Sequence, residues 1–222
     1  MRPFRNVHVL SGGFTLEGDL HTTRNAVAVV VLVHGSGVTR RERRNDFIAR
    51  RLESAGFATL LVDLLEEPET RDRHNVFDVE MQAERLVEVI HWLGRERRTR
   101  ALPVGLFGMG IGAGIVLRAA ARAPQRVRAI VCRGGRPDTA LPCLWQVRAP
   151  TLFIDDNADA VPDWCATAYR AMRAPASIVR VASRSHLYRE PDALNAVGQH
   201  AERWFSRHLA RCEASEPTQA AL

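Results

Sequence analysis

Residues 103–116 place an apolar stretch, a dense run of glycines and a segment of small helix-forming residues directly after one another. The apolar stretch at 104–107 predicts a short buried strand, and the helix predicted for 112–123 stops before Pro124. A helix that begins so soon after a strand needs a tight turn, which glycine permits at no steric cost. The segment therefore predicts one strand-turn-helix unit.

The same alternation of strand and helix patterns runs along most of the 222 residues. After a leading hairpin at 7–9 and 14–19, strands are predicted at 26–34, 58–63, 104–107, 127–132, 151–155 and 177–181, and helices at 46–55, 79–93, 112–123, 163–172 and 193–209. Such alternation predicts an α/β fold, a mostly parallel sheet with helices on both faces. We expect a single domain over residues 1–210 and a flexible tail at 211–222.

Polar and glycine residues follow the predicted parallel strands, where each strand ends. They are Gly110 and the segments 34–37, 132–136, 155–159 and 183–186. Ligands of such sheets bind beyond the carboxyl ends of the strands, so these segments are expected to form one site. Segments 39–46 and 66–78 are expected at its rim.

The glycine-rich turn has the build of a nucleophile elbow, G-x-S-x-G, with Gly108 and Gly112 in place. Position 110, where the serine of that motif belongs, is glycine. Gly110 has no side chain to attack a substrate. It also relieves the strained backbone that an elbow imposes, so we expect the fold to tolerate it.

Acyl-transfer hydrolysis needs a nucleophile, a histidine base, an orienting carboxylate and backbone donors for the oxyanion. In chain order, position 110 is followed by Asp159 after one predicted strand and by His186 after the last. The backbone N–H groups of Ser36 and Ile111 are the expected oxyanion donors. Asp155 and Asp156 are alternative loop carboxylates, and all three aspartates could instead cap turns.

The chain resembles small α/β-hydrolases of the dienelactone-hydrolase-like group from about residue 14 to residue 209. The residues that carry the resemblance are the segments 16–20, 33–37, 60–65, 105–108, 133–138, 149–152 and 185–187. The resemblance implies an ester or lactone hydrolase scaffold without a large cap, with Asp159 and His186 as triad members and a small-molecule ester or lactone as substrate. The chain departs from the family pattern at Gly110, so covalent acyl-enzyme catalysis is expected to be absent or very weak.

Two other functions remain open from the sequence. One is a non-catalytic ligand-binding or regulatory pseudoenzyme that uses the hydrolase pocket. The other, a minor alternative, is an NADP-binding protein, because Gly108, Gly110 and Ala113 match G-x-G-x-x-[G/A] and Arg133 follows the next strand. That fingerprint normally opens the first strand-helix-strand unit, whereas here it lies in the middle of the chain.

Several neighbouring residues have both a functional and a structural interpretation. Arg133 and Arg136 could bind an acidic group of the substrate, or could stabilise their loop together with Asp138. Cys132 could face the site, although a buried, inert thiol is the commoner case. His34 is expected to hold the turn that carries Ser36.

Charge and residue spacing limit the kinds of partner, cofactor and cellular location that the sequence predicts. The net charge is +6 and arginine supplies every basic residue, but glutamates interrupt the runs at 40–44 and 95–100, which predicts solvated helix faces and no nucleic-acid partner. The four cysteines lack CxxC spacing and the histidines lack ligand spacing, so neither metal nor cofactor is expected. No secretory signal or membrane segment is predicted, which favours the cytoplasm. The oligomeric state is not predicted.

Overall fold

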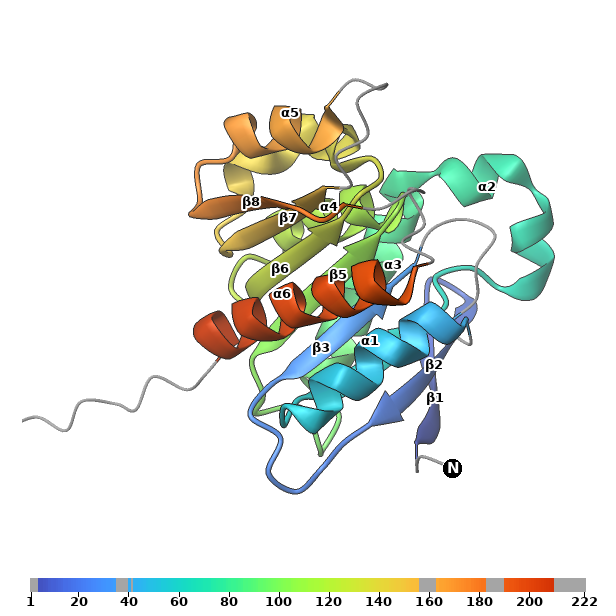
Figure 1. Ribbon diagram of the computed structural model, residues 1–222. Coiled ribbons are helices and arrows are strands. Elements are labelled where there is room, and N and C mark those ends of the chain that lie inside the picture. The colour runs from blue at the N-terminus through green and yellow to red at the C-terminus, as the bar shows by residue number, and fades with distance from the viewer. Residues whose placement is uncertain (1–3, 35–39, 41, 156–162, 183–189, 210–222) are drawn as a thin grey trace, which may run out of the picture.

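In the part of the chain that the structure describes, eight strands form one sheet in the order β1-β2-β4-β3-β5-β6-β7-β8. The computed structural model describes residues 4–34, 40, 42–155, 163–182 and 190–209. Strands β3 to β8 run parallel, and β1 and β2 form an antiparallel hairpin that joins the sheet at β4 (Figure 1). The strands are β1 (Arg5–Ser11), β2 (Phe14–His21), β3 (Val29–Val33), β4 (Ala58–Val62), β5 (Val104–Met109), β6 (Val127–Arg133), β7 (Thr151–Asp155) and β8 (Ala176–Arg180).

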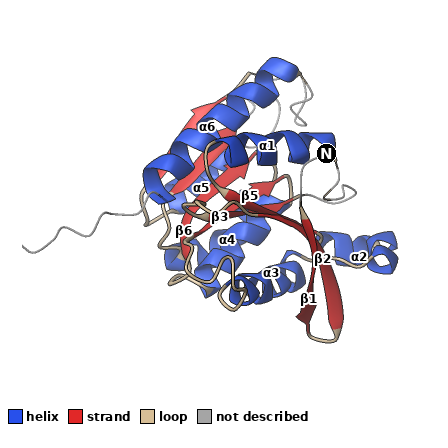
Figure 2. Cartoon of the chain, turned by 90° about the horizontal axis from the view of Figure 1, so that it is seen from below, coloured by secondary structure: helices blue, strands red, loops and turns tan. Residues whose placement is uncertain are grey.

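Helices cover both faces of this sheet. Helices α1 and α6 pack on one face, and α3, α4 and α5 contribute buried residues to the core on the other (Figure 2). The α-helices are α1 (Arg43–Ser54), α2 (Arg73–Phe77), α3 (Val79–Leu93), α4 (Gly112–Arg122), α5 (Trp164–Ala171) and α6 (Pro191–Leu209), and two 3₁₀ segments are η1 (Glu67–Arg71) and η2 (Pro137–Gln146).

The continuous apolar runs are explained by burial on both sides. Along β3, Val29, Val31 and Val33 belong to the core beneath α3 and α4. Val30 and Leu32 belong to the core beneath α1 and α6. Because successive side chains of a strand point to opposite faces, a strand covered on both faces must be apolar throughout.

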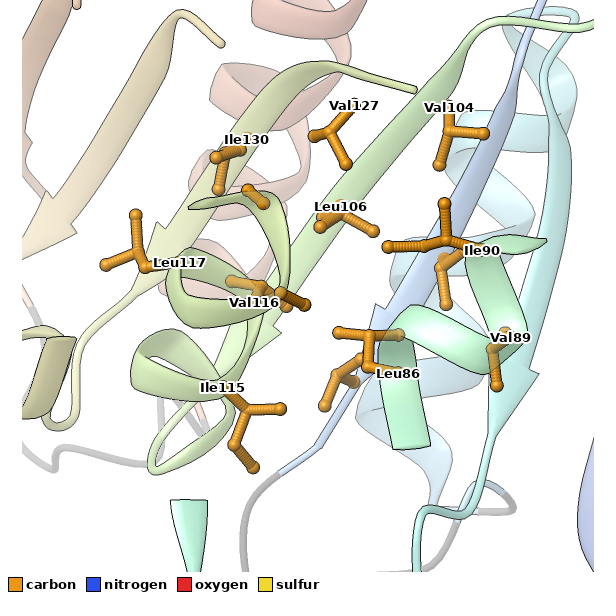
Figure 3. Packing of buried hydrophobic residues seen from close by; sticks show 14 of the residues in the cluster. Leu86, Val89, Ile90, Val104, Leu106, Ile115, Val116, Leu117, Val127 and Ile130 are labelled. Carbon is orange, nitrogen blue, oxygen red and sulfur yellow. The ribbon is translucent and has the colours of Figure 1, made fainter. Parts of the chain in front are cut away.

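The core beneath α3 and α4 is built from interlocking aliphatic side chains. Leu86 and Ile90 of α3 lie beside Leu106 of β5 and Val116 of α4, and all four are fully buried (Figure 3). This packing fixes α4 against β5, so the turn that joins them is held between two rigid elements.

The structure confirms the α/β fold, the single domain, and the mostly parallel sheet with helices on both faces. The bounds predicted for α3 and β7 agree with those observed. Elements η1, α2 and η2 have no counterpart among the predicted elements, because each is short or, in the case of η2, interrupted by Pro142. The predicted tail at 211–222 lies outside the described residues, and the domain boundary at 210 stays a prediction.

We predict that Phe205→Ala lowers the free energy of unfolding by about 3–5 kcal/mol. Phe205 is fully buried between α6 and the sheet, and its ring meets Phe57 edge to face at 6.3 Å. The matched control is Phe77→Ala, because Phe77 is 53% exposed. Urea denaturation of both variants would measure the difference, and equal losses would contradict the packing described here.

Candidate functional site

The sheet topology selects one place for a site. From β3 the chain moves outward to β4, then returns to β5 on the other side of β3. Ligands of open parallel sheets bind outside the carboxyl ends of the strands at such a switch point. His34 follows β3 and Gly110 follows β5 at this point.

Gly110 occupies the turn between β5 and α4 with φ of +61°. Residues that carry a side chain rarely adopt this left-handed backbone conformation. Its N–H donates to the Arg133 carbonyl at 3.3 Å, and its carbonyl accepts from the N–H groups of Ala113 and Arg136, each at 3.2 Å. The turn is therefore fixed by its own helix and by the loop after β6.

The loop after β6 contacts this turn backbone to backbone. Gly135 has φ of +77°, and a Cβ atom built on it would lie 2.0 Å from the Gly110 carbonyl oxygen. Only a residue without a side chain fits there. The glycines of the two loops thus form a single packed unit at the carboxyl edge of the sheet.

Ile111 comes next, at the position directly before the first residue of α4, and is half-buried. The backbone N–H groups at a helix N-terminus favour an anion. This position is compatible with the oxyanion role predicted for the Ile111 amide, and that role stays a prediction.

The two arginines of the loop after β6 lie in different environments. Arg133 of β6 lies opposite Met109 of β5 in the parallel strand pairing, and it is 6% exposed. Arg136 is exposed, and its guanidinium donates two hydrogen bonds to the Asp138 carboxylate at 2.8 Å. It also lies over the Trp164 ring at 4.4 Å. The pair with Asp138 raises the pKa of Arg136 and is the contact that the loop-stabilising interpretation predicts.

The surroundings of Cys132 do not favour a reactive thiol. It is fully buried in β6, and its Sγ lies 3.8 Å from the Ala113 carbonyl. Burial raises the pKa of the thiol well above its usual value, which suppresses the thiolate. The buried, inert interpretation of Cys132 is the one that the structure supports.

A cluster of charged residues lies beside the switch point and is not predicted from the sequence. The His34 ring hydrogen-bonds through Nε2 to Oδ1 of Asp63 at 2.9 Å. The backbone N–H of Arg40 donates to the same oxygen at 2.9 Å, and the Arg40 guanidinium pairs with Oδ2. Arg40 also contacts Glu17 at 2.6 Å.

One prediction about this region is wrong. The sequence predicts Arg40 on a solvated helix face with the rest of its arginine run, but its side chain is only 7% exposed because carboxylates surround it. The one signal in the sequence is an aspartate, Asp63, directly after the buried strand β4. His34 is held in place as the structural interpretation expected.

Three predicted site residues, Ser36, Asp159 and His186, lie outside the described residues. The elements around them are described: Asp159 belongs to the connection from β7 to α5, and His186 to the connection from β8 to α6. Both connections leave the carboxyl ends of parallel strands, the same edge that carries Gly110.

Among the described residues, no group of His, Cys, Asp and Glu is arranged to hold a metal ion. In that part of the chain there is also no helix of the length and apolar character that a membrane span requires.

Comparison with known proteins agrees with this architecture. A family model described as the alpha/beta hydrolase fold matches residues 28–180. The crystal structure of a dienelactone hydrolase from Anabaena variabilis is 40% identical, with a TM-score of 0.89 over 93% of this chain and 98% of that chain. A dienelactone hydrolase-like promiscuous phosphotriesterase from metagenomic libraries shares the fold at 16% identity, with a TM-score of 0.76 over 93% of this chain and 98% of its own.

Proteins of two Mycobacterium tuberculosis strains, each named a putative phosphoribosyl transferase, are 43% identical to this chain over 204 residues. The match covers 91% of this chain and 46% of each relative. The chain therefore spans about half the length of these curated relatives.

We predict that Gly135→Ala destabilises the protein more than Gly12→Ala does. Gly12 also has a positive φ, of +54°, but open space surrounds it, so its substitution costs only the backbone conformation, about 1–2 kcal/mol. At Gly135 the overlap with Gly110 adds roughly 1–3 kcal/mol. Thermal and urea unfolding of the two variants measure the difference, and equal losses would show that the two loops are not in tight contact.

Proposed function

The chain belongs to the alpha/beta hydrolase family, and from that premise we propose that it is a dienelactone hydrolase-like protein of ester or lactone hydrolase type whose nucleophile position is occupied by Gly110. The observation that carries this proposal is the geometry of Gly110. It stands at the switch point of the sheet, in a left-handed turn between β5 and α4. A nucleophile elbow has this strand-turn-helix geometry, and its central residue carries the attacking group.

The other roles follow the chain order of the family. His186 is proposed as the base, Asp159 as the carboxylate that orients it, and the N–H groups of Ser36 and Ile111 as oxyanion donors. Their support is that the described strands β3, β5, β7 and β8 bring the four connections concerned to one edge of the sheet. Arg136 is proposed to contact an acidic part of the substrate from its exposed position over Trp164, whereas Arg133 is buried and is proposed to stabilise its loop.

Covalent catalysis has no attacking atom at Gly110, so the proposed reaction of this chain is slow. Water adds to the acyl carbon, His186 takes the proton of that water, and the departing alkoxide receives it, which yields an acid and an alcohol. In enzymes that lose the nucleophile, oxyanion donors and binding still supply roughly 10³–10⁴-fold over the uncatalysed rate.

A second candidate is a ligand-binding or regulatory protein that uses the same pocket without turnover. The tight packing of Gly110 against Gly135 supports it, because this turn is closely packed although Gly110 carries no attacking group. A small ester or lactone that raises the melting temperature and is recovered chemically unchanged would distinguish it from a slow hydrolase.

Two other activities have weaker support. The NADP fingerprint lies after β5, in the middle of the sheet order, and the Arg133 side chain that would meet a 2′-phosphate is buried. The phosphoribosyl transferase name applies to relatives of which this chain matches 46%. The matching segment of this chain has the hydrolase fold, so that name does not predict its activity.

We predict that Gly110→Ser gains esterase activity on p-nitrophenyl acetate and butyrate, with kcat/KM at least about 100-fold above that of the unmodified chain. The introduced hydroxyl follows β5 at the edge of the sheet that β3 and β8 also reach, and the connections after those strands carry the proposed donor Ser36 and the proposed base His186. Adding His186→Ala to this variant is expected to remove the gain, because the serine then lacks its base.

The matched control is Gly12→Ser, which places serine at another left-handed glycine, in the turn between β1 and β2. It should leave the activity unchanged. A folded Gly110→Ser variant without activity on any ester would contradict the proposal, and a His186→Ala change without effect on the residual rate would contradict the water mechanism.

A further inference from the structure

We propose that Asp63 is a positioning residue whose carboxylate holds both ends of the connection between β3 and α1. The inference rests on the proposed function in one respect: that connection carries Ser36, the proposed oxyanion donor. The fixed ends would set where the donor lies relative to the acyl group.

The first observation is that one carboxylate contacts residues on both sides of segment 35–39. His34, directly before the segment, bonds to Oδ1 of Asp63 at 2.9 Å. Arg40, directly after it, donates its backbone N–H to the same oxygen at 2.9 Å. The Asp63 carboxylate therefore holds the backbone of Arg40 as well as the ring of His34.

The second observation is that the anchor itself is rigid. Asp63 directly follows β4, which is hydrogen-bonded to β3 on one side and to β2 on the other. Its own N–H donates to the Glu17 carbonyl at 3.0 Å. The backbone of Asp63 is therefore fixed to the sheet. Its carboxylate then fixes His34 and Arg40 relative to the edge of the sheet.

The third observation is the charge of the Asp63 carboxylate. Burial alone would raise the pKa of Asp63, but the hydrogen bonds from His34 and Arg40 outweigh it and lower that pKa below its ordinary value. Asp63 is thus an anion at neutral pH and accepts all of these bonds. Hydrogen bonds to a charged acceptor are stronger than neutral ones.

Arg40 in turn is held from several sides. Its guanidinium pairs with Oδ2 of Asp63, with Glu17 at 2.6 Å and with Asp19 at 3.4 Å. The Arg40 side chain is 7% exposed, whereas that of Glu17 is 52% exposed. The Glu17 carboxylate contacts the same guanidinium but is largely exposed, so it provides a matched control for the loss of one carboxylate.

The first test is hydrogen–deuterium exchange of peptides that span residues 34–40, measured on Asp63→Asn and Glu17→Gln. Asp63→Asn is expected to speed exchange in this segment at least about 10-fold, because the charged acceptor is lost, while exchange in α3 stays unchanged. Glu17→Gln should remain within about 2-fold of the unmodified chain. Unchanged exchange in a folded Asp63→Asn variant overturns the proposal.

The second test places both changes in the Gly110→Ser background. A displaced oxyanion donor lowers kcat and leaves substrate binding largely intact, so Asp63→Asn is expected to lower kcat at least about 10-fold with KM within about 3-fold. Glu17→Gln should change neither. An equal loss in both variants, or a loss in KM alone, contradicts the positioning role.

The two tests separate the claims. An inactive Gly110→Ser variant contradicts the proposed function, and the exchange experiment still decides whether Asp63 anchors the connection. If Asp63→Asn does not fold, the same exchange test is made on His34→Gln, which removes only the ring contact with Asp63. A smaller increase in the exchange rate is then expected, at the His34 end of the segment.

Discussion

Backbone-to-backbone packing around the turn from β5 to α4 is the constraint on which the arrangement of the site depends. A Cβ atom on Gly108 would lie 2.5 Å from the Gly112 carbonyl oxygen, and one on Gly112 would lie 2.7 Å from the Val33 carbonyl oxygen. The start of α4 thus rests directly on the ends of β5 and β3. Gly135 closes the same turn from the side of β6. These contacts are made by the backbone around Gly108, Gly112 and Gly135, so they do not depend on a side chain at position 110.

Much of the fold was predictable because its signals are local. Asp78 caps the first turn of α3 by accepting from the N–H groups of Glu80 and Met81, and Gly94 ends the helix, so both bounds were visible in the sequence. The strands were visible as apolar runs. The segment that forms η1 and α2 has no buried residue in either helix, and so it shows no apolar periodicity from which to predict them.

The candidate site was predictable only in part. The parallel alternation indicated which strand ends come together, and the elbow motif placed Gly110 among them. The role of Asp63 was not predictable, because its partners Arg40 and Glu17 are 23 and 46 residues away in sequence, and only the pairing of β2, β3 and β4 brings them together. An arginine inside a charged run gives no sign in the sequence that it is buried.

The central claim is that position 110 is where the nucleophile of this scaffold belongs. The most direct measurement is covalent labelling of the Gly110→Ser variant with a fluorophosphonate, followed by intact-mass and peptide analysis. The serine oxygen would displace fluoride and form a phosphorus–oxygen bond only if a base and oxyanion donors face it. The account predicts one adduct per chain on the introduced serine, and none on the unmodified chain or on Gly12→Ser. A folded Gly110→Ser variant that takes up no label would contradict it.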